Sequence, residues 1–172
     1  MGGHCSSVDP WFLVEAAPEL AQVIRAARGV NDAQPHFVVD LVRRALGDLN
    51  GRRIAALGLA YKPDVDDLRE SPAIEIVHLL QAAGAVVSAF EPFKPDYNQD
   101  GVRSSATLAE TVQDAEAILL LVGHSDLKPL DPRALAAITP ARIAVDTVNA
   151  WPVDRWQAAG FSLHRLGVGA AR

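Results

Sequence analysis

The chain shows two different rhythms of apolar and polar residues, one in its first third and another in the rest. From Trp11 to Asn50, apolar residues recur at spacings of three and four, the periodicity of amphipathic helices. Gly29 and Pro35 interrupt this stretch, because glycine weakens a helix and proline blocks its continuation. The pattern predicts two helices, or one kinked helix, over roughly residues 18–28 and 33–47.

After Gly51, short apolar segments alternate with helical ones. Helix signals accompany this change, such as Ser71 as an N-cap before Pro72 and Gly84 beyond the last turn. Alternating strands and helices predict a parallel sheet with helices on both faces, because right-handed crossovers cover both sides of buried strands. The expected strands are residues 53–57, 85–90, 117–122, 142–146 and 161–166.

The expected fold is therefore α/β, with an N-terminal helical arm followed by a Rossmann-like parallel sheet of about five strands. Residues 1–50 would hold a cysteine segment and the arm, and residues 51–172 the Rossmann-like domain. The apolar stripe of the arm needs a partner surface. We therefore expect a homodimer through residues 11–50.

Composition and charge exclude several classes of protein. The formal net charge of −5 argues against nucleic-acid binding, which usually shows a basic stripe. The longest apolar run, residues 115–123, is broken by Glu116 and is too short to cross a bilayer. The start has no signal-peptide pattern, and one cysteine cannot form an intrachain disulfide. We expect a cytoplasmic protein without membrane or nucleic-acid partners, and the spacing of the histidines predicts no metal site.

The loop after the first expected strand carries the densest set of candidate binding residues. It runs from Gly58 to Pro72 and contains Lys62, Arg69 and several carboxylates. Ligands of open parallel sheets bind beyond the carboxyl ends of the strands, where a helix start also offers N–H donors to anions. The alternative is a solvated loop whose charges pair internally. Glu91, after the second strand, is either a ribose-binding carboxylate or part of a plain turn.

A dinucleotide site normally places three spaced glycines at a strand-to-helix turn, because the backbone must approach the pyrophosphate closely. Gly58 stands alone after the first strand, and Gly167-Val168-Gly169 has no helix after it. The Rossmann-like domain is therefore not expected to bind a dinucleotide in the usual way.

Cys5 lies between Gly2-Gly3-His4 and Asp9-Pro10. Paired glycines allow backbone angles that present a thiol, a neighbouring histidine favours the thiolate, and an aspartate can order an acid-base network. The alternative is a cysteine that serves as a small buried apolar residue.

Taken together, Gly2–Cys5 with Asp9-Pro10, Asn31-Asp32, Gly58–Asp64 and Arg69–Pro72 resemble the UDP-glucose/GDP-mannose dehydrogenase family in order and spacing. The resemblance covers nearly the whole chain, and the cysteine segment is most similar to that of UDP-N-acetyl-D-mannosamine dehydrogenases. It implies oxidation of the C6 hydroxyl of a nucleotide sugar to a carboxylate in two steps, with two NAD and a thiohemiacetal on the cysteine.

The resemblance also implies roles for individual residues. Cys5 would be the nucleophile, Asp9 the acid-base residue, and Arg69 would lie near the NAD cofactor. The arm would be the long central helix through which family members dimerise. The residues that bind the substrate would be Lys62, Gly3 and Tyr61.

Two departures from the family modify this hypothesis. Family members carry a nicotinamide-binding domain and further catalytic residues ahead of the cysteine, so we expect NAD to bind mainly outside these 172 residues and the chain alone to be inactive. Val148 follows Asp146-Thr147 where relatives commonly have a basic residue, which puts the strength of nucleotide binding in question. The alternative function is a non-catalytic UDP-sugar-binding or dimerisation module.

Overall fold

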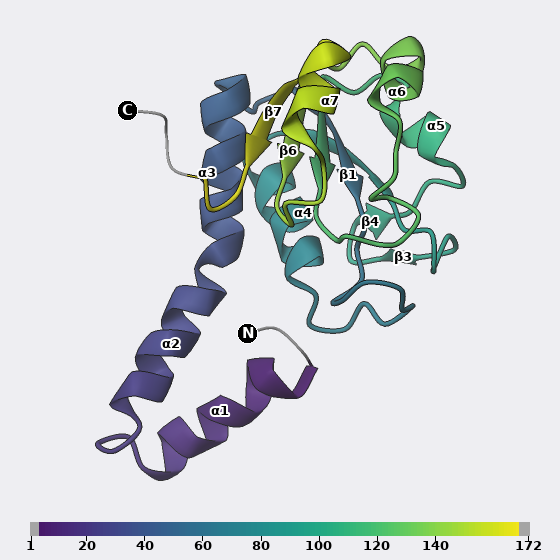
Figure 1. The fold of residues 1–172 in the computed structure, drawn as a ribbon. Coiled ribbons are helices and arrows are strands. Elements are labelled where there is room, and N and C mark those ends of the chain that lie inside the picture. Colours follow the sequence, from purple (N-terminus) through teal and green to yellow (C-terminus); the bar gives the residue numbers. More distant parts are fainter. Residues whose placement is uncertain (1–3, 169–172) are drawn as a thin grey trace.

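The computed structural model describes residues 4–168, with side chains from Val8 onward. Five parallel strands form one sheet in the order β2-β1-β5-β6-β7 (Figure 1). The strands of this sheet are β1 (Arg53–Leu57), β2 (Val86–Phe90), β5 (Ala117–Leu120), β6 (Ile143–Asp146) and β7 (Ser162–Arg165). A separate short antiparallel hairpin consists of β3 (Asn98–Gln99) and β4 (Val102–Arg103).

Helices cover both faces of the sheet, as the alternation of strands and helices predicts. The connecting helices are α4 (Pro72–Ala82), α5 (Leu108–Val112), α6 (Pro132–Ile138) and α7 (Val153–Ala158). Successive side chains of a strand point to opposite faces, and in β1 Ile54 and Ala56 belong to one buried cluster while Ala55 and Leu57 belong to another. The first cluster lies against α4, and the second lies against α5, α6 and α7.

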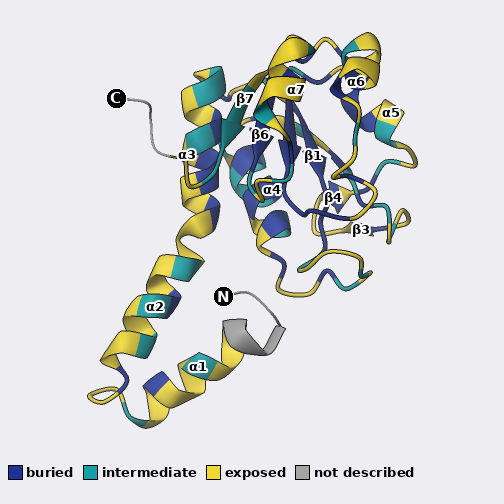
Figure 2. Cartoon of the chain, viewed as in Figure 1, coloured by how far each residue is buried: buried dark blue, intermediate teal, exposed yellow. Residues whose placement is uncertain are grey.

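The helical arm consists of α1 (His4–Ala16), α2 (Gln22–Asp32) and α3 (Gln34–Leu46). Only Ala33, in right-handed helical conformation, separates α2 from α3, so these two helices form a nearly continuous rod (Figure 1). α1 folds back beside α2 and contacts it. α3 packs on α4 through Val38, Val39 and Val42, whereas α1 and α2 extend away from the sheet with mostly exposed residues (Figure 2).

The predicted fold class is confirmed: a helical arm precedes a five-stranded parallel sheet with helices on both faces. The N-caps at Ser71 and Thr107 are also confirmed, because each hydroxyl accepts a backbone N–H of the first helical turn. The helix expected over residues 18–28 starts too early in the prediction, since residues 18–20 form a turn and α2 begins at Gln22.

Two elements do not follow from the sequence pattern. α1 contains Pro10, which removes a backbone hydrogen bond and argues against a helix when only the local sequence is read. The β3–β4 hairpin has only two residues in each strand, too few for a visible alternation. No helix among residues 4–168 combines the length and the apolar character needed to cross a membrane.

Gly58 directly follows β1, where the carboxyl ends of β1, β2 and β5 lie side by side. Its φ of +84° lies in the left-handed region, and a Cβ at this position would lie 2.7 Å from Val122 Cβ and 2.9 Å from Val122 O. Its N–H donates a hydrogen bond to Phe90 O at 2.9 Å. The absence of a side chain therefore lets the loop after β1 lie directly against the segment after β5.

We predict that Gly58→Ala lowers the free energy of unfolding by about 2–4 kcal/mol, because the strain of a positive φ adds to a backbone clash. Urea denaturation followed by circular dichroism measures the change. Gly101→Ala is the matched control, since Gly101 has a φ of +78° and its Cβ would meet no atom within 4 Å. Equal losses in the two variants would contradict the close approach at Gly58.

Candidate functional site

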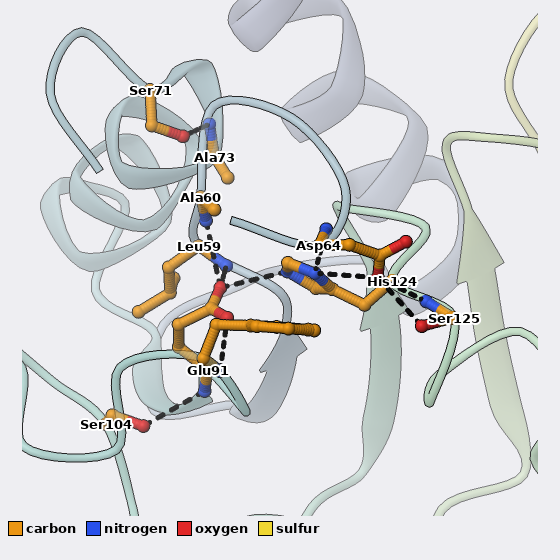
Figure 3. Close-up of polar contacts among 10 residues, drawn as sticks. Leu59, Ala60, Asp64, Ser71, Ala73, Glu91, Ser104, His124 and Ser125 are labelled. Atoms are coloured by element: carbon orange, nitrogen blue, oxygen red, sulfur yellow. Dashed lines mark hydrogen bonds and ion pairs between the residues drawn. The ribbon is translucent and has the colours of Figure 1, made fainter. Parts of the chain in front are cut away.

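Two fully buried polar side chains lie beyond the two strands that flank β1. Glu91 directly follows β2 and His124 lies in the segment after β5, and both are 0 % exposed. The carboxyl ends of β2, β1 and β5 are adjacent, so both side chains reach the loop that follows β1 (Figure 3). Buried charged groups need several hydrogen bonds to offset their desolvation, so these partners define the local structure.

The Glu91 carboxylate binds the backbone of the loop after β1. Its Oε2 accepts hydrogen bonds from Leu59 N–H at 2.6 Å and Ala60 N–H at 2.9 Å, and it also pairs with His124 Nε2 at 3.1 Å. Its Oε1 accepts Phe93 N–H at 3.0 Å. Glu91 therefore begins the turn after β2, in which Lys94 N–H donates to Glu91 O at 3.3 Å, and its carboxylate is not a free ribose ligand. It occupies backbone donors of the kind that bind phosphate in dinucleotide-binding domains.

The hydrogen bonds of His124 define its tautomer. Nδ1 lies 2.9 Å from the backbone nitrogen of Asp64 and must accept that hydrogen bond, so Nδ1 carries no proton. The proton of the neutral ring is then on Nε2, which donates to Glu91. The ring also stacks on Phe93 with centroids 5.0 Å apart. His124 thus joins the carboxylate in the core to the outer part of the loop.

Asp64 connects the same loop to the segment after β5 on the solvent side. Its Oδ1 accepts hydrogen bonds from Ser125 N–H at 2.7 Å and Ser125 Oγ at 2.9 Å. The Ser125 N–H, followed by the Ser125 hydroxyl, lowers the pKa of Asp64 below its ordinary value. The crevice between the carboxyl ends of β1 and β5 is the topological switch point of this sheet. The hydrogen bonds of Asp64 with His124 and Ser125 join the loops on its two sides.

The three predicted binding residues of the loop have different environments. Tyr61 is half-buried, and its N–H donates to Asp67 O at 3.1 Å. Lys62 is exposed, with Nζ 5.3 Å from the centre of the Tyr61 ring. Arg69 is also exposed, but its Nε and one terminal nitrogen donate to the two carboxylate oxygens of Asp67 at 2.9 and 2.7 Å. The alternative of internal charge pairing therefore applies to Arg69.

A cleft of about 910 Å³ lies between the arm and this loop. Val8 and Trp11 of α1 line one side of the cleft, together with Asn31 and Asp32 at the end of α2. The loop lines the opposite wall. Several of the motif segments that carry the family resemblance therefore converge on one cavity. Its lining residues from the loop and the start of α4 are Tyr61, Asp66, Asp67, Leu68, Arg69, Glu70, Ser71 and Pro72.

The predicted residues near the start of the chain are only partly described. Gly3 lies outside the described residues, and Cys5 belongs to the first turn of α1 with a side chain outside the described ones. Asp9 is exposed on α1. Val8, one turn after Cys5, lines the cleft, so this end of α1 lies beside the cavity.

Val148 is 42 % exposed at the carboxyl end of β6. A Cβ on Gly123 would lie 3.3 Å from Val148 Cγ2 and 3.0 Å from Lys128 Cε, so the Lys128 chain passes beside the same glycine. Buried Asp146 holds the Val148 segment by accepting the N–H groups of Val148 and Trp151 at 2.9 and 2.8 Å. The Lys128 side chain therefore lies near Val148, the position at which relatives commonly have a basic residue.

His124 is the main polar residue of this region that sequence reasoning misses. The spacing of the histidines gives it no special role, and Glu91 has no partner when the sequence alone is read. A signal exists, because each residue is the first ionisable residue after a predicted strand, and β2 and β5 both neighbour β1. Among residues 4–168, no group of three or more His, Cys, Asp or Glu side chains is arranged to hold a metal ion.

Comparisons with known proteins agree with the motifs. Residues 55–153 match the UDP-binding domain of the UDP-glucose/GDP-mannose dehydrogenase family. The NDP-N-acetyl-D-galactosaminuronic acid dehydrogenase of Ralstonia nicotianae is 42% identical over 159 residues, covering 90% of this chain and 36% of the relative. The UDP-N-acetyl-D-mannosamine dehydrogenase of Methanocaldococcus jannaschii is 35% identical over 172 residues, covering 98% of this chain and 39% of the relative.

The fold is shared with a solved structure of a UDP-D-ManNAc dehydrogenase from Pyrococcus horikoshii. The TM-score is 0.84 at 30% sequence identity, and the match covers 97% of this chain and 38% of that chain. The chain thus spans less than two-fifths of the length of these relatives.

We predict that Glu91→Gln lowers the free energy of unfolding by about 2–3 kcal/mol at pH 7, because charge-assisted hydrogen bonds are lost and an amide donor faces buried N–H groups. Burial raises the pKa of Glu91, but the hydrogen bonds from His124, Leu59 and Phe93 outweigh it and hold the pKa below its ordinary value of 4.5. A lowered pKa stabilises the fold above pH 4.5, and this stabilisation is lost as the pH falls through the folded-state pKa.

The stability difference between Glu91→Gln and the unmodified chain should therefore narrow below about pH 4.5. Urea denaturation in a pH series from neutral to acid measures it. Glu110→Gln, at an exposed position of α5, is the control and should change stability little. A difference that is independent of pH would contradict the assignment of Glu91 as a buried carboxylate.

Proposed function

The chain belongs to the UDP-glucose/GDP-mannose dehydrogenase family, and on that premise we propose that it is the sugar-nucleotide-binding part of an NAD-dependent nucleotide-sugar 6-dehydrogenase. The proposed reaction converts UDP-N-acetylmannosamine to UDP-N-acetylmannosaminuronate. The names of the relatives from Methanocaldococcus jannaschii and Pyrococcus horikoshii support this choice of sugar. The relative from Ralstonia nicotianae is named for another N-acetylated sugar, which supports an N-acetylhexosamine more generally.

The observation that carries the proposal is the convergence of separate motifs on one cleft. Asn31-Asp32 and Tyr61 line the same cavity of about 910 Å³, and the end of α1 that carries Cys5 lies beside it. This volume is within the range of about 300–1,000 Å³ typical of small-molecule sites. A nucleotide sugar bound here would place its reacting carbon between the arm and the loop.

In the proposed chemistry, the Cys5 thiolate adds to the C6 aldehyde of the sugar and holds it as a thiohemiacetal. The covalent bond retains the aldehyde until the second oxidation. Asp9, on the same helix one turn further along, would move the proton of the C6 hydroxyl or of water. Lys62, with Gly3 and Tyr61, would bind the substrate.

The described residues do not fit the pyrophosphate of NAD at the β1–α4 turn. Glu91 already accepts the N–H groups of Leu59 and Ala60, and Gly58 is packed against Val122. We therefore propose that NAD binds mainly to the part of the relatives that this chain does not span, with Arg69 at the edge of that site. Activity would then require that part as well.

A second candidate is a non-catalytic UDP-sugar-binding or dimerisation module. The apolar residues of the arm favour its dimerisation role, because Phe12, Leu20 and Val23 are 63, 89 and 81 % exposed. Such exposure on α1, on α2 and in the turn between them is typical of an interface. The two candidates share the ligand site and the arm, and they differ in whether Cys5 takes part in turnover.

We predict that the purified chain binds UDP-N-acetylmannosamine and does not bind NAD, because the N–H groups of Leu59 and Ala60 are already bound to Glu91. Isothermal titration calorimetry with each ligand separately measures this. NAD binding without sugar-nucleotide binding would contradict the proposed division of roles. Turnover through Cys5 when the part of a relative that this chain does not span is supplied would favour the enzyme over the module, and a Cys5→Ser variant is its control.

We predict that Lys62→Met weakens binding of UDP-N-acetylmannosamine by about tenfold, since a hydrogen bond to a charged group contributes about 1.5–3 kcal/mol. Calorimetry compares this variant with Arg133→Met, which removes an exposed cation on α6. Equal affinities in the two variants would contradict a substrate role for Lys62.

We predict that the chain is a homodimer in solution and that Leu20→Asp combined with Val23→Asp makes it monomeric, because charges would be buried in an apolar interface. Sedimentation velocity at micromolar concentration measures the change. Val86→Asp is the control, since Val86 is 58 % exposed on β2, a strand at the edge of the sheet and outside residues 11–50. A monomeric unmodified chain would refute the interface.

A further inference from the structure

We propose that His124 is a positioning residue for the nucleotide sugar, acting through Asp64 on the segment that contains Lys62. This inference rests on the proposed function, because the ligand is the one proposed there. Tyr61 lines the cleft, whereas Lys62 and His124 do not, so the effect of His124 on binding would be transmitted through the loop segment that joins Asp64 to Tyr61.

The segment that contains Lys62 is held at both of its ends. On one side, Ala60 N–H is bound to the buried Glu91 carboxylate at 2.9 Å. On the other, Asp64 N–H is bound to the buried His124 ring at 2.9 Å. Only Tyr61, Lys62 and Pro63 lie between these two anchors.

The hydrogen bond to His124 helps to hold Asp64 in an uncommon backbone conformation. Asp64 has a φ of +62°, in the left-handed region that a residue with a side chain seldom adopts. The hydrogen bonds of its N–H to His124 and of its carboxylate to Ser125 hold this conformation. Loss of the inner hydrogen bond would leave the Asp64 end of the segment held only by Ser125, and the ligand would then have to order Lys62 on binding.

A neutral imidazole matches the two requirements of the position. Asp64 N–H needs an acceptor, and the Glu91 carboxylate needs a donor, at opposite sides of one ring. An asparagine side chain places its oxygen near the position of Nδ1, and a glutamine side chain places its nitrogen near that of Nε2. Asparagine therefore retains the acceptor for Asp64 N–H, and glutamine retains the donor to Glu91.

The experiment compares His124→Asn with His124→Gln. Both variants should lose stability in urea denaturation. Only His124→Gln removes the acceptor for Asp64 N–H, so it should weaken binding of UDP-N-acetylmannosamine by about tenfold, while His124→Asn stays within about threefold of the unmodified chain. Calorimetry is performed at a temperature where circular dichroism shows each variant folded. Amide hydrogen exchange of Asp64 should be slow in the unmodified chain and in His124→Asn, and fast in His124→Gln.

Ser125→Ala gives a second test if a His124 variant does not fold. It removes the outer hydroxyl that binds Asp64 Oδ1 at 2.9 Å, at an exposed position, and should weaken binding by about threefold.

Equal weakening in the Asn and Gln variants would overturn the inference, because stability alone would then explain the effect. Unchanged binding in both His124→Gln and Ser125→Ala would also overturn it and would leave the proposed function standing. An unmodified chain that does not bind the sugar nucleotide would overturn the proposed function, and the inference with it.

Discussion

The burial of the Glu91 carboxylate is the constraint on which the rest of this region depends. An ionised carboxyl group without exposure is strongly unfavourable unless donors surround it. Here the donors are the backbone of two loops and one imidazole, so the loop after β1 can take its conformation only while Glu91 is present. A side chain performs the role that a bound phosphate has in dinucleotide-binding domains, and this explains how a Rossmann-like sheet can lack the glycine-rich turn.

This arrangement separates structure from ligand binding within a single loop. The inner backbone of the loop is committed to Glu91 and His124, whereas Lys62 is exposed and the ring of Tyr61 lies beside it. Arg69 is paired with Asp67, so a ligand that uses its guanidinium has to compete with a carboxylate. The proposed ligand site is therefore the cleft beside the arm and not the switch point of the sheet.

Local sequence predicts the strands and the helix caps well, because their signals are apolar runs and single capping residues such as Ser71 and Thr107. It fails for α1, where Pro10 lies inside a helix that packs against α2. It also misses the pairing of Glu91 with His124, since 33 positions separate them and only the strand order makes them neighbours. The sequence also leaves open whether Arg69 pairs within the loop, because the side-chain rotamers of Asp67 and Arg69 decide that ion pair.

The junction at Ala33 determines how the outer part of the arm is held. α3 is embedded in the core against α4, and α2 continues the rod for 11 residues, about 16 Å at the usual rise of an α-helix. Because the junction keeps a helical conformation, α2 projects in line from α3, the part of the rod that is packed on α4. The packing of α3 on α4 therefore also fixes where α2 forms its wall of the cleft, relative to the loop that carries Lys62 and ends at the start of α4.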